Sequence, residues 1–139
     1  MQDQKLQEKY ILFQLLSQNM ESLKQQQQMV QHQMLETKST ITSIDDLAKT
    51  KEGTDVFIPF GSGCFGKGTV MDKNKILVNI GSGLFMNKET GNAKTLLEKR
   101  MKDIERASEE LNTHIERVTK QLNEMGAEIQ QLTQKQGKS

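Results

Sequence analysis

A seven-residue repeat of apolar residues runs through residues 1–52 and returns in residues 92–139. In the first segment the two lines of repeat positions are Leu6, Phe13, Met20, Gln27, Met34, Ile41 and Ala48, and Lys9, Leu16, Leu23, Val30, Thr37 and Ile44. In the second segment they are Met101, Ser108, Ile115, Leu122 and Ile129, and Leu97, Ile104, Leu111, Val118, Met125 and Leu132. Two such lines, offset by three or four residues, are typical of coiled-coil helices. We therefore expect an N-terminal coiled-coil helix in 1–52 and a C-terminal one in 92–139.

The two seams match in length, so the helices should fold back antiparallel on each other. The register can be argued from the polar residues that interrupt the seams. A slip of one whole heptad from the best match would leave two of them, Thr37 and Ser108, facing apolar residues, at about 1–3 kcal/mol for each unpaired polar group. The expected facing pairs are Leu23–Leu122, Thr37–Ser108, Lys9–Gln136 and, as the one mismatch, Gln27–Val118.

The segment between the helices, residues 53–91, contains one glycine motif twice. It holds Phe60-Gly61-Ser62-Gly63-Cys64-Phe65 and then Ile80-Gly81-Ser82-Gly83-Leu84-Phe85. Glycine permits the positive φ of tight turns, and the β-branched and aromatic flanks favour strands. We expect strands at 55–60, 64–71, 75–80 and 84–88, and an N-cap for the second helix at Thr90 or Asn92. The predicted fold is α+β, a long antiparallel two-helix coiled coil joined by a compact unit of two β-hairpins.

This hairpin unit is also the expected assembly surface. Its apolar side chains are too few to form an independent core, and each hairpin leaves unpaired strand edges that another subunit would satisfy. The candidate assembly residues are Val56, Ile58, Phe60, Val70, Leu77, Val78, Ile80 and Phe85.

The free ends of the two helices carry a second candidate surface. Residues 10–13, Tyr-Ile-Leu-Phe, are four apolar residues in a row, so they cover every side of one helical turn. Such a turn either packs against neighbouring subunits or is an exposed apolar patch kept for binding, which we favour. The candidate binding residues at this tip are Leu6, Tyr10, Ile11, Leu12, Phe13, Ile129 and Leu132.

Composition argues against several other functions. The 19 basic and 18 acidic residues nearly cancel, which does not suit nucleic-acid binding, and no apolar run is long enough for a membrane span or a signal peptide. Gly61-x-Gly63-x-x-Gly66 matches a dinucleotide fingerprint, but a strand and not a helix should follow it. Cys64 is expected to be a buried packing residue, and His32 and His114 to be solvated. We expect a cytoplasmic protein, no enzyme, with neither cofactor nor metal.

The doubled hairpin motif between two long helices, with Phe57-Ile58-Pro59-Phe60-Gly61-Ser62-Gly63 and Ile76-Leu77-Val78-Asn79-Ile80-Gly81-Ser82-Gly83-Leu84-Phe85, resembles the archaeal-type α-class subunit of prefoldin. The resemblance covers nearly the whole chain. It implies a hexamer of two α and four β-class subunits in which the hairpins form a double β-barrel. It also implies an ATP-independent holdase chaperone whose coiled-coil tips capture unfolded proteins and deliver them to a group II chaperonin. The alternative is a structural coiled-coil spacer or a filament-forming relative.

Overall fold

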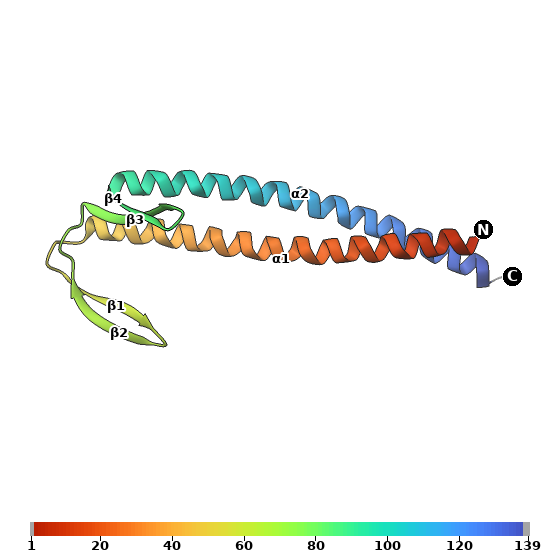
Figure 1. Ribbon diagram of the computed structural model, residues 1–139, viewed down its shortest axis with the longest axis horizontal. Helices are drawn as coiled ribbons and strands as arrows, with labels where there is room; N and C mark the ends of the chain where they lie inside the picture. The colour runs from red at the N-terminus through yellow and green to blue at the C-terminus, as the bar shows by residue number, and fades with distance from the viewer. Residues whose placement is uncertain (1, 138–139) are drawn as a thin grey trace. The chain divides into compact units, whose positions relative to one another are not determined.

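The computed structural model describes the backbone of residues 2–137 and the side chains of residues 3–135. Along the chain it contains two long helices and four short strands, which confirms the predicted α+β fold (Figure 1). The elements are α1 (Gln2–Lys49), β1 (Asp55–Gly61), β2 (Cys64–Thr69), β3 (Lys75–Gly81), β4 (Leu84–Glu89) and α2 (Thr90–Gly137). The predicted strands agree with these bounds to within two residues. Neither helix has, within the described residues, a stretch apolar enough to cross a membrane.

The residue contacts divide the chain into two compact units. The first contains α1 up to Gln33 and α2 from Ile104, and here the helices lie side by side and antiparallel. Its buried core is formed by apolar side chains from the seams of both helices. These are Met20, Leu23 and Val118, with Leu16, Leu111, Ile115 and Leu122 packed around them.

The helix register in this unit differs from the expected one. The side-chain amide of Gln27 donates a hydrogen bond to Asn112 Oδ1, at 2.8 Å. Val118, which was expected opposite Gln27, is instead buried in the core with Met20 and Leu23. The pairing of Gln27 with Val118 was therefore wrong, and the polar mismatch that it implied does not occur.

The error amounts to six to eight residues, or about one heptad, because Asn112 lies six residues before Val118 and Glu128 lies eight residues before Gln136. A slip of one heptad was rejected from the sequence because it places Thr37 and Ser108 opposite apolar residues. The apolar seam residues repeat every seven positions and so stay in contact after such a slip, and Thr37 and Ser108 are only half-buried. The ion pair between Lys9 Nζ and Glu128 Oε2, at 2.7 Å, fits the observed register. Gln136, the expected partner of Lys9, and Ser139, expected opposite Leu6, lie outside the residues whose side chains are described.

The second unit, Met34–Asp103, contains the rest of both helices and the two hairpins. One face of the β3–β4 hairpin packs on the helices, because Val78 is buried together with Ile44 of α1 and Ala93 of α2. Around this cluster lie Ile76, Leu96 and Leu97.

Polar contacts fix the same hairpin to the helices. Arg100 Nη2 of α2 donates to the Asn79 carbonyl at 2.8 Å, and Thr90 Oγ1 donates to the Lys73 carbonyl at 2.7 Å. Thr90 begins α2, and its hydroxyl is used for this contact with the segment before β3. An ion pair joins Lys94 Nζ to Asp45 at 2.7 Å, and this hydrogen bond and charge raise the pKa of Lys94. Hairpin β3–β4 is therefore packed against, and hydrogen-bonded to, the helices of its own chain.

The two hairpins have the same turn. Strand β1 pairs antiparallel with β2, and β3 with β4, and each pairing shifts register just before the turn. Ser62 and Gly63 have φ of 52° and 78°, and Ser82 and Gly83 have 53° and 74°. Two successive positive φ values are those of a type I′ turn, whose twist suits a tight hairpin. The repeated glycine motif thus encodes one local structure twice.

Candidate functional site

The first candidate surface is the open face of hairpin β1–β2. Val56, Ile58 and Phe60 alternate along β1 and so share one face. They correspond in the repeat to Ile76, Val78 and Ile80, but Ile58 and Phe60 are 49% and 74% exposed, whereas Val78 is buried. The chain itself therefore covers the middle of this face in the second hairpin, at Val78, but leaves it open in the first, while Ile80 at the end of the face is still 44% exposed.

Two glycines of β2 shape this open face. Gly66 lies opposite Ile58, and Gly68 lies opposite Val56. A Cβ at Gly66 would collide with the Phe60 ring, and one at Gly68 would lie 2.8 Å from Ile58 Cδ1. The apolar side chains of β1 thus lean over a strand that presents no side chain at these points, which leaves a flat apolar surface.

The opposite faces of both hairpins are apolar and exposed as well. Phe57 and Phe65 are exposed on β1–β2, and Leu77 and Phe85 are exposed on β3–β4. Among the described residues, each sheet has only two strands, so every strand has one edge without a neighbour. These hairpins therefore offer apolar faces and unpaired backbone groups together, which is the combination that strand pairing with another chain uses.

The predicted assembly residues fall into two groups. Val70 and Val78 are buried within this chain, and Val56 is half-buried. The exposed members are Ile58, Phe60, Leu77, Ile80 and Phe85. Four further side chains of the hairpins are exposed but were not predicted, although the same strand alternation also places them on these faces: Phe57, Phe65, Leu84 and Met86.

The second candidate surface is the apolar turn near the start of α1. Tyr10, Ile11 and Leu12 are each about half exposed, at 48%, 57% and 51%. Leu15 is 56% exposed and was not predicted, although it lies one turn beyond Ile11 on the same side of the helix. We call Tyr10, Ile11, Leu12 and Leu15 the tip patch.

The other predicted tip residues belong to the seam. Leu6, Phe13 and Leu132 are half-buried, and Ile129 is buried. The structure thus separates the predicted set into a seam group, of which Ile129 is buried and the others are half-buried, and an exposed group on the helix surface. Only the exposed group presents substantial apolar surface.

A shallow groove of about 290 Å³ adjoins the tip patch. Its apolar lining is formed by Leu12 and Leu16 of α1 and Met125 of α2. Its polar lining comes from α2 alone and contains two carboxylates, Glu124 and Glu128, besides Gln121.

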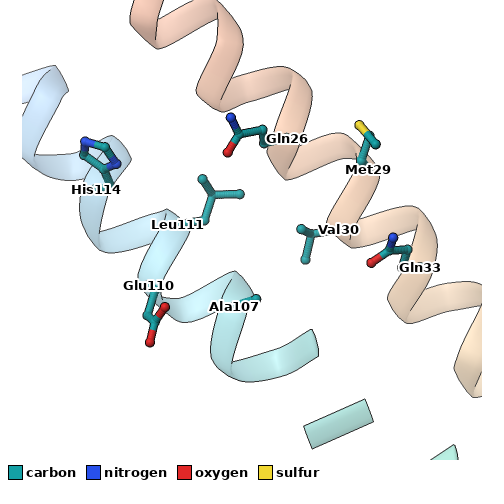
Figure 2. Close-up of a pocket in the computed structure, with 8 residues that line it drawn as sticks. All are labelled: Gln26, Met29, Val30, Gln33, Ala107, Glu110, Leu111 and His114. Atoms are coloured by element: carbon teal, nitrogen blue, oxygen red, sulfur yellow. The ribbon is translucent and has the colours of Figure 1, made fainter. Parts of the chain in front are cut away.

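A second groove, of about 410 Å³, lies further along the same helix pair (Figure 2). Val30 and Leu111 point toward each other across it, and Ala107 is too small to fill the space between them (Figure 2). Met29 on its rim is exposed. Side chains of both helices line this groove, and no ion pair between the described residues crosses it. The small Ala107 side chain in its lining therefore indicates that the two helices are locally underpacked here.

The chemistry of a cofactor or metal site has little support. The described residues contain no cluster of three or more side chains that would hold a metal ion. Gly61, Gly63 and Gly66 lie in a hairpin turn and strand β2, not before a helix, so they lack the context of a dinucleotide site. Cys64 is exposed, so the expectation that it is buried was wrong for this chain.

Comparison with known proteins points to one family. A sequence model of prefoldin subunits matches residues 16–135. The chain is 31% identical over 123 residues to prefoldin subunit alpha of Pyrococcus horikoshii, covering 88% of this chain and 79% of the relative. It is 27% identical over 115 residues to prefoldin subunit alpha of Methanobrevibacter smithii, covering 78% of this chain and 79% of the relative.

Solved structures show the same fold. A chain of filamentous PFD from Methanocaldococcus jannaschii aligns with a TM-score of 0.73 at 18% identity, covering 84% of this chain and 96% of the other. The prefoldin beta subunit from Thermococcus strain KS-1 aligns with a TM-score of 0.59 at 17% identity, covering 91% and 90%. At these identities the likeness establishes the fold alone.

Proposed function

Since the chain belongs to the prefoldin family, we propose that it is the α subunit of a chaperone that holds unfolded proteins without ATP and delivers them to a group II chaperonin in the cytoplasm. In this proposal the hairpins join it to β-class subunits, as two α and four β in a hexamer. The helix tips contact the unfolded protein, which we call the client. The chain performs no catalysis.

The observation that carries this proposal is the exposure of the tip patch. A helix pair that served only as a rod would bury its apolar residues in the seam and present polar ones elsewhere. Here Ile11 and Leu15 are more than half exposed one turn apart, while Leu16 and Met20 next to them pack in the seam. The other exposed apolar side chains of α1, Met29 and Leu35, stand apart in the sequence, whereas a contiguous exposed patch is typical of a binding surface.

Several helix tips in one oligomer can hold a client even when each tip binds it weakly. Each tip patch offers only a few side chains, so a single contact with a client is expected to be weak and short-lived. Hairpin-mediated assembly places several tips in one particle, and binding at one tip raises the effective client concentration at the others. Client holding therefore depends on both candidate surfaces, the hairpins for valency and the tips for contact.

The test is suppression of aggregation by the assembled protein. The chain is mixed with a β-class subunit, and the native mass of the product is measured. The same product is then added to a chemically denatured protein diluted into buffer without nucleotide. We expect a defined hetero-oligomer that lowers light scattering at near-stoichiometric amounts, and an assembled product that leaves scattering unchanged would refute the holdase role.

A structural role is the second candidate, because one fold relative is a filamentous PFD. In that case the hairpins would join copies of this chain end to end, and the tips would be contacts within the filament. Native mass discriminates the two, since a filament grows with concentration whereas a closed hetero-oligomer has one mass.

A further inference from the structure

The groove beside the tip patch contains a carboxylate, that of Glu124, with which no described cation forms an ion pair. Glu124 and Glu128 lie one helical turn apart on α2, and both line this groove. Lys9 crosses from α1 and neutralises Glu128 at 2.7 Å. No described residue makes an ion pair or a side-chain hydrogen bond with Glu124, including Lys120 one turn earlier.

The sequence of α1 explains why no cation reaches Glu124. Because the helices are antiparallel, moving one turn from Glu128 to Glu124 means moving about one turn from Lys9 toward the residues after it. The α1 residues that share the groove there are Leu12 and Leu16, and both are apolar. Lys9 of α1 thus supplies the ammonium group that pairs with Glu128 of α2. One turn further along α1 there is no lysine that could pair with Glu124 in the same way.

The surroundings of Glu124 are apolar and open. Leu12 belongs both to the groove and to the exposed tip patch, so the two surfaces are continuous. Met125 lines the groove beside it, and its flexible thioether side chain can adapt to differently shaped apolar groups. A ligand bound in this groove would therefore contact the apolar lining and, beside it, the Glu124 carboxylate.

We infer that this groove, the Glu124 groove, binds segments of unfolded polypeptide in which an apolar side chain has a lysine or arginine close to it in sequence. The apolar side chain packs on Leu12, Leu16 and Met125, and the cation pairs with Glu124. This inference rests on the proposed client-binding role of the tip and adds a selectivity to it. Lysine and arginine suit the site because their aliphatic stems can lie along the apolar lining while the charge reaches the carboxylate.

The preference is expected to be modest and electrostatic. An exposed ion pair corresponds to roughly a 2- to 5-fold change in affinity. Since salt at about 1 M shortens the Debye length to about 3 Å, the preference should shrink strongly there while apolar binding persists.

Three blocked peptides test the inference directly. They share one apolar core and differ at a single neighbouring position, which is lysine, glutamine or glutamate, and their binding to the full chain in its assembly is measured by fluorescence anisotropy. We expect the lysine peptide to bind roughly 2- to 5-fold tighter than the glutamine peptide, and the glutamate peptide to bind weakest. In Glu124→Gln, the lysine and glutamine peptides should bind alike, with the glutamine peptide bound as in the parent.

Glu116→Gln is the matched control, because it removes the same charge from an exposed position of α2 outside the groove. It should keep the full preference for lysine. Equal binding of the three peptides by the parent, or equal loss of preference in both variants, overturns the charge selectivity but leaves apolar client binding in place. Absence of binding for all three peptides overturns the client-binding role of the tip, and the selectivity with it.

Discussion

Two serines hold a backbone conformation that serine seldom adopts. Ser62 and Ser82 have φ of 52° and 53° at the first position of their turns. This left-handed region is strained for most residues with a Cβ, and asparagine tolerates it best after glycine. The flanking glycines, Gly61 and Gly81, take φ of 107° and 120°, where any side chain would be strained, so the motif places its glycines where the turn requires them most.

The first prediction follows from this strain. Ser82→Asn should stabilise the chain by a few tenths to about 1 kcal/mol, because asparagine accepts the left-handed backbone more readily. Ser82→Val should destabilise it by about 1–3 kcal/mol, because a β-branched residue is least tolerated there. Urea unfolding midpoints measure both, and equal midpoints for the two variants would show that the turn does not constrain residue 82.

At the scale of elements, the two hairpins share a sequence motif but not an environment. Hairpin β3–β4 is held to its own helices by Val78 and by the hydrogen bond from Arg100, whereas the equivalent face of β1–β2 is open. An aspartate introduced at equivalent positions should therefore act in two different ways.

The second prediction compares those positions. Ile58→Asp should leave the helix content of the chain intact and disperse the oligomer, since an unpaired carboxylate in a shared apolar interface costs several kcal/mol. Val78→Asp should lower the stability of the free chain itself, because Val78 is already buried there. Sedimentation gives the assembly state and circular dichroism the unfolding midpoint; an intact oligomer for Ile58→Asp would assign assembly to the helices instead.

The third prediction concerns the helix register. Cysteines at Gln27 and Asn112, in a Cys64→Ser background, should form a disulfide on mild oxidation faster than the pair expected from the polar layers, because the ends of these two native side chains lie 2.8 Å apart. Cysteines at Gln27 and Val118 should oxidise much more slowly, since the second site is roughly 9 Å further along the helix. Gel mobility after oxidation measures both rates. The reverse order would restore the register expected from the polar layers.

At the scale of the whole molecule, most of the fold could be predicted because its signals are local and repeated. The heptad lines and the doubled glycine motif each specify an element by periodicity or by backbone requirement, and the strand bounds agree to within two residues. The register was wrong because both seams repeat every seven residues, so the choice between registers one heptad apart changes few apolar contacts. Local sequence gives little information on that choice, and the Gln27–Asn112 bond settles it only in three dimensions.

The candidate surfaces could be predicted in part. Residues 10–12 were found because four consecutive apolar residues cannot all face the seam. Leu15 was missed because it stands alone between polar and seam residues, and Ile129 was included although its burial depends on the partner helix. The role proposed for Glu124 could not be predicted from the sequence. It depends on which α1 residues lie opposite Glu124, and these are Leu12 and Leu16 and not a lysine that could pair with it.

The central claim is that the tip patch holds unfolded protein, and one variant tests it most directly. Changing Tyr10, Ile11 and Leu12 together to serine or glutamine removes exposed apolar side chains from the patch, so thermal stability should hardly change. Leu23→Ala is the control for core damage, and it should cost about 2–5 kcal/mol of stability by leaving a cavity.

The decisive measurement is light scattering of a denatured client diluted into the assembled triple variant, at a temperature where variant and parent are equally folded. The account predicts that the variant forms an oligomer of the parent's mass but suppresses aggregation much less, because the removed side chains are worth up to roughly 1.5–3 kcal/mol each when a client covers them fully. Suppression equal to that of the parent by the intact variant oligomer would contradict the account and favour the structural role.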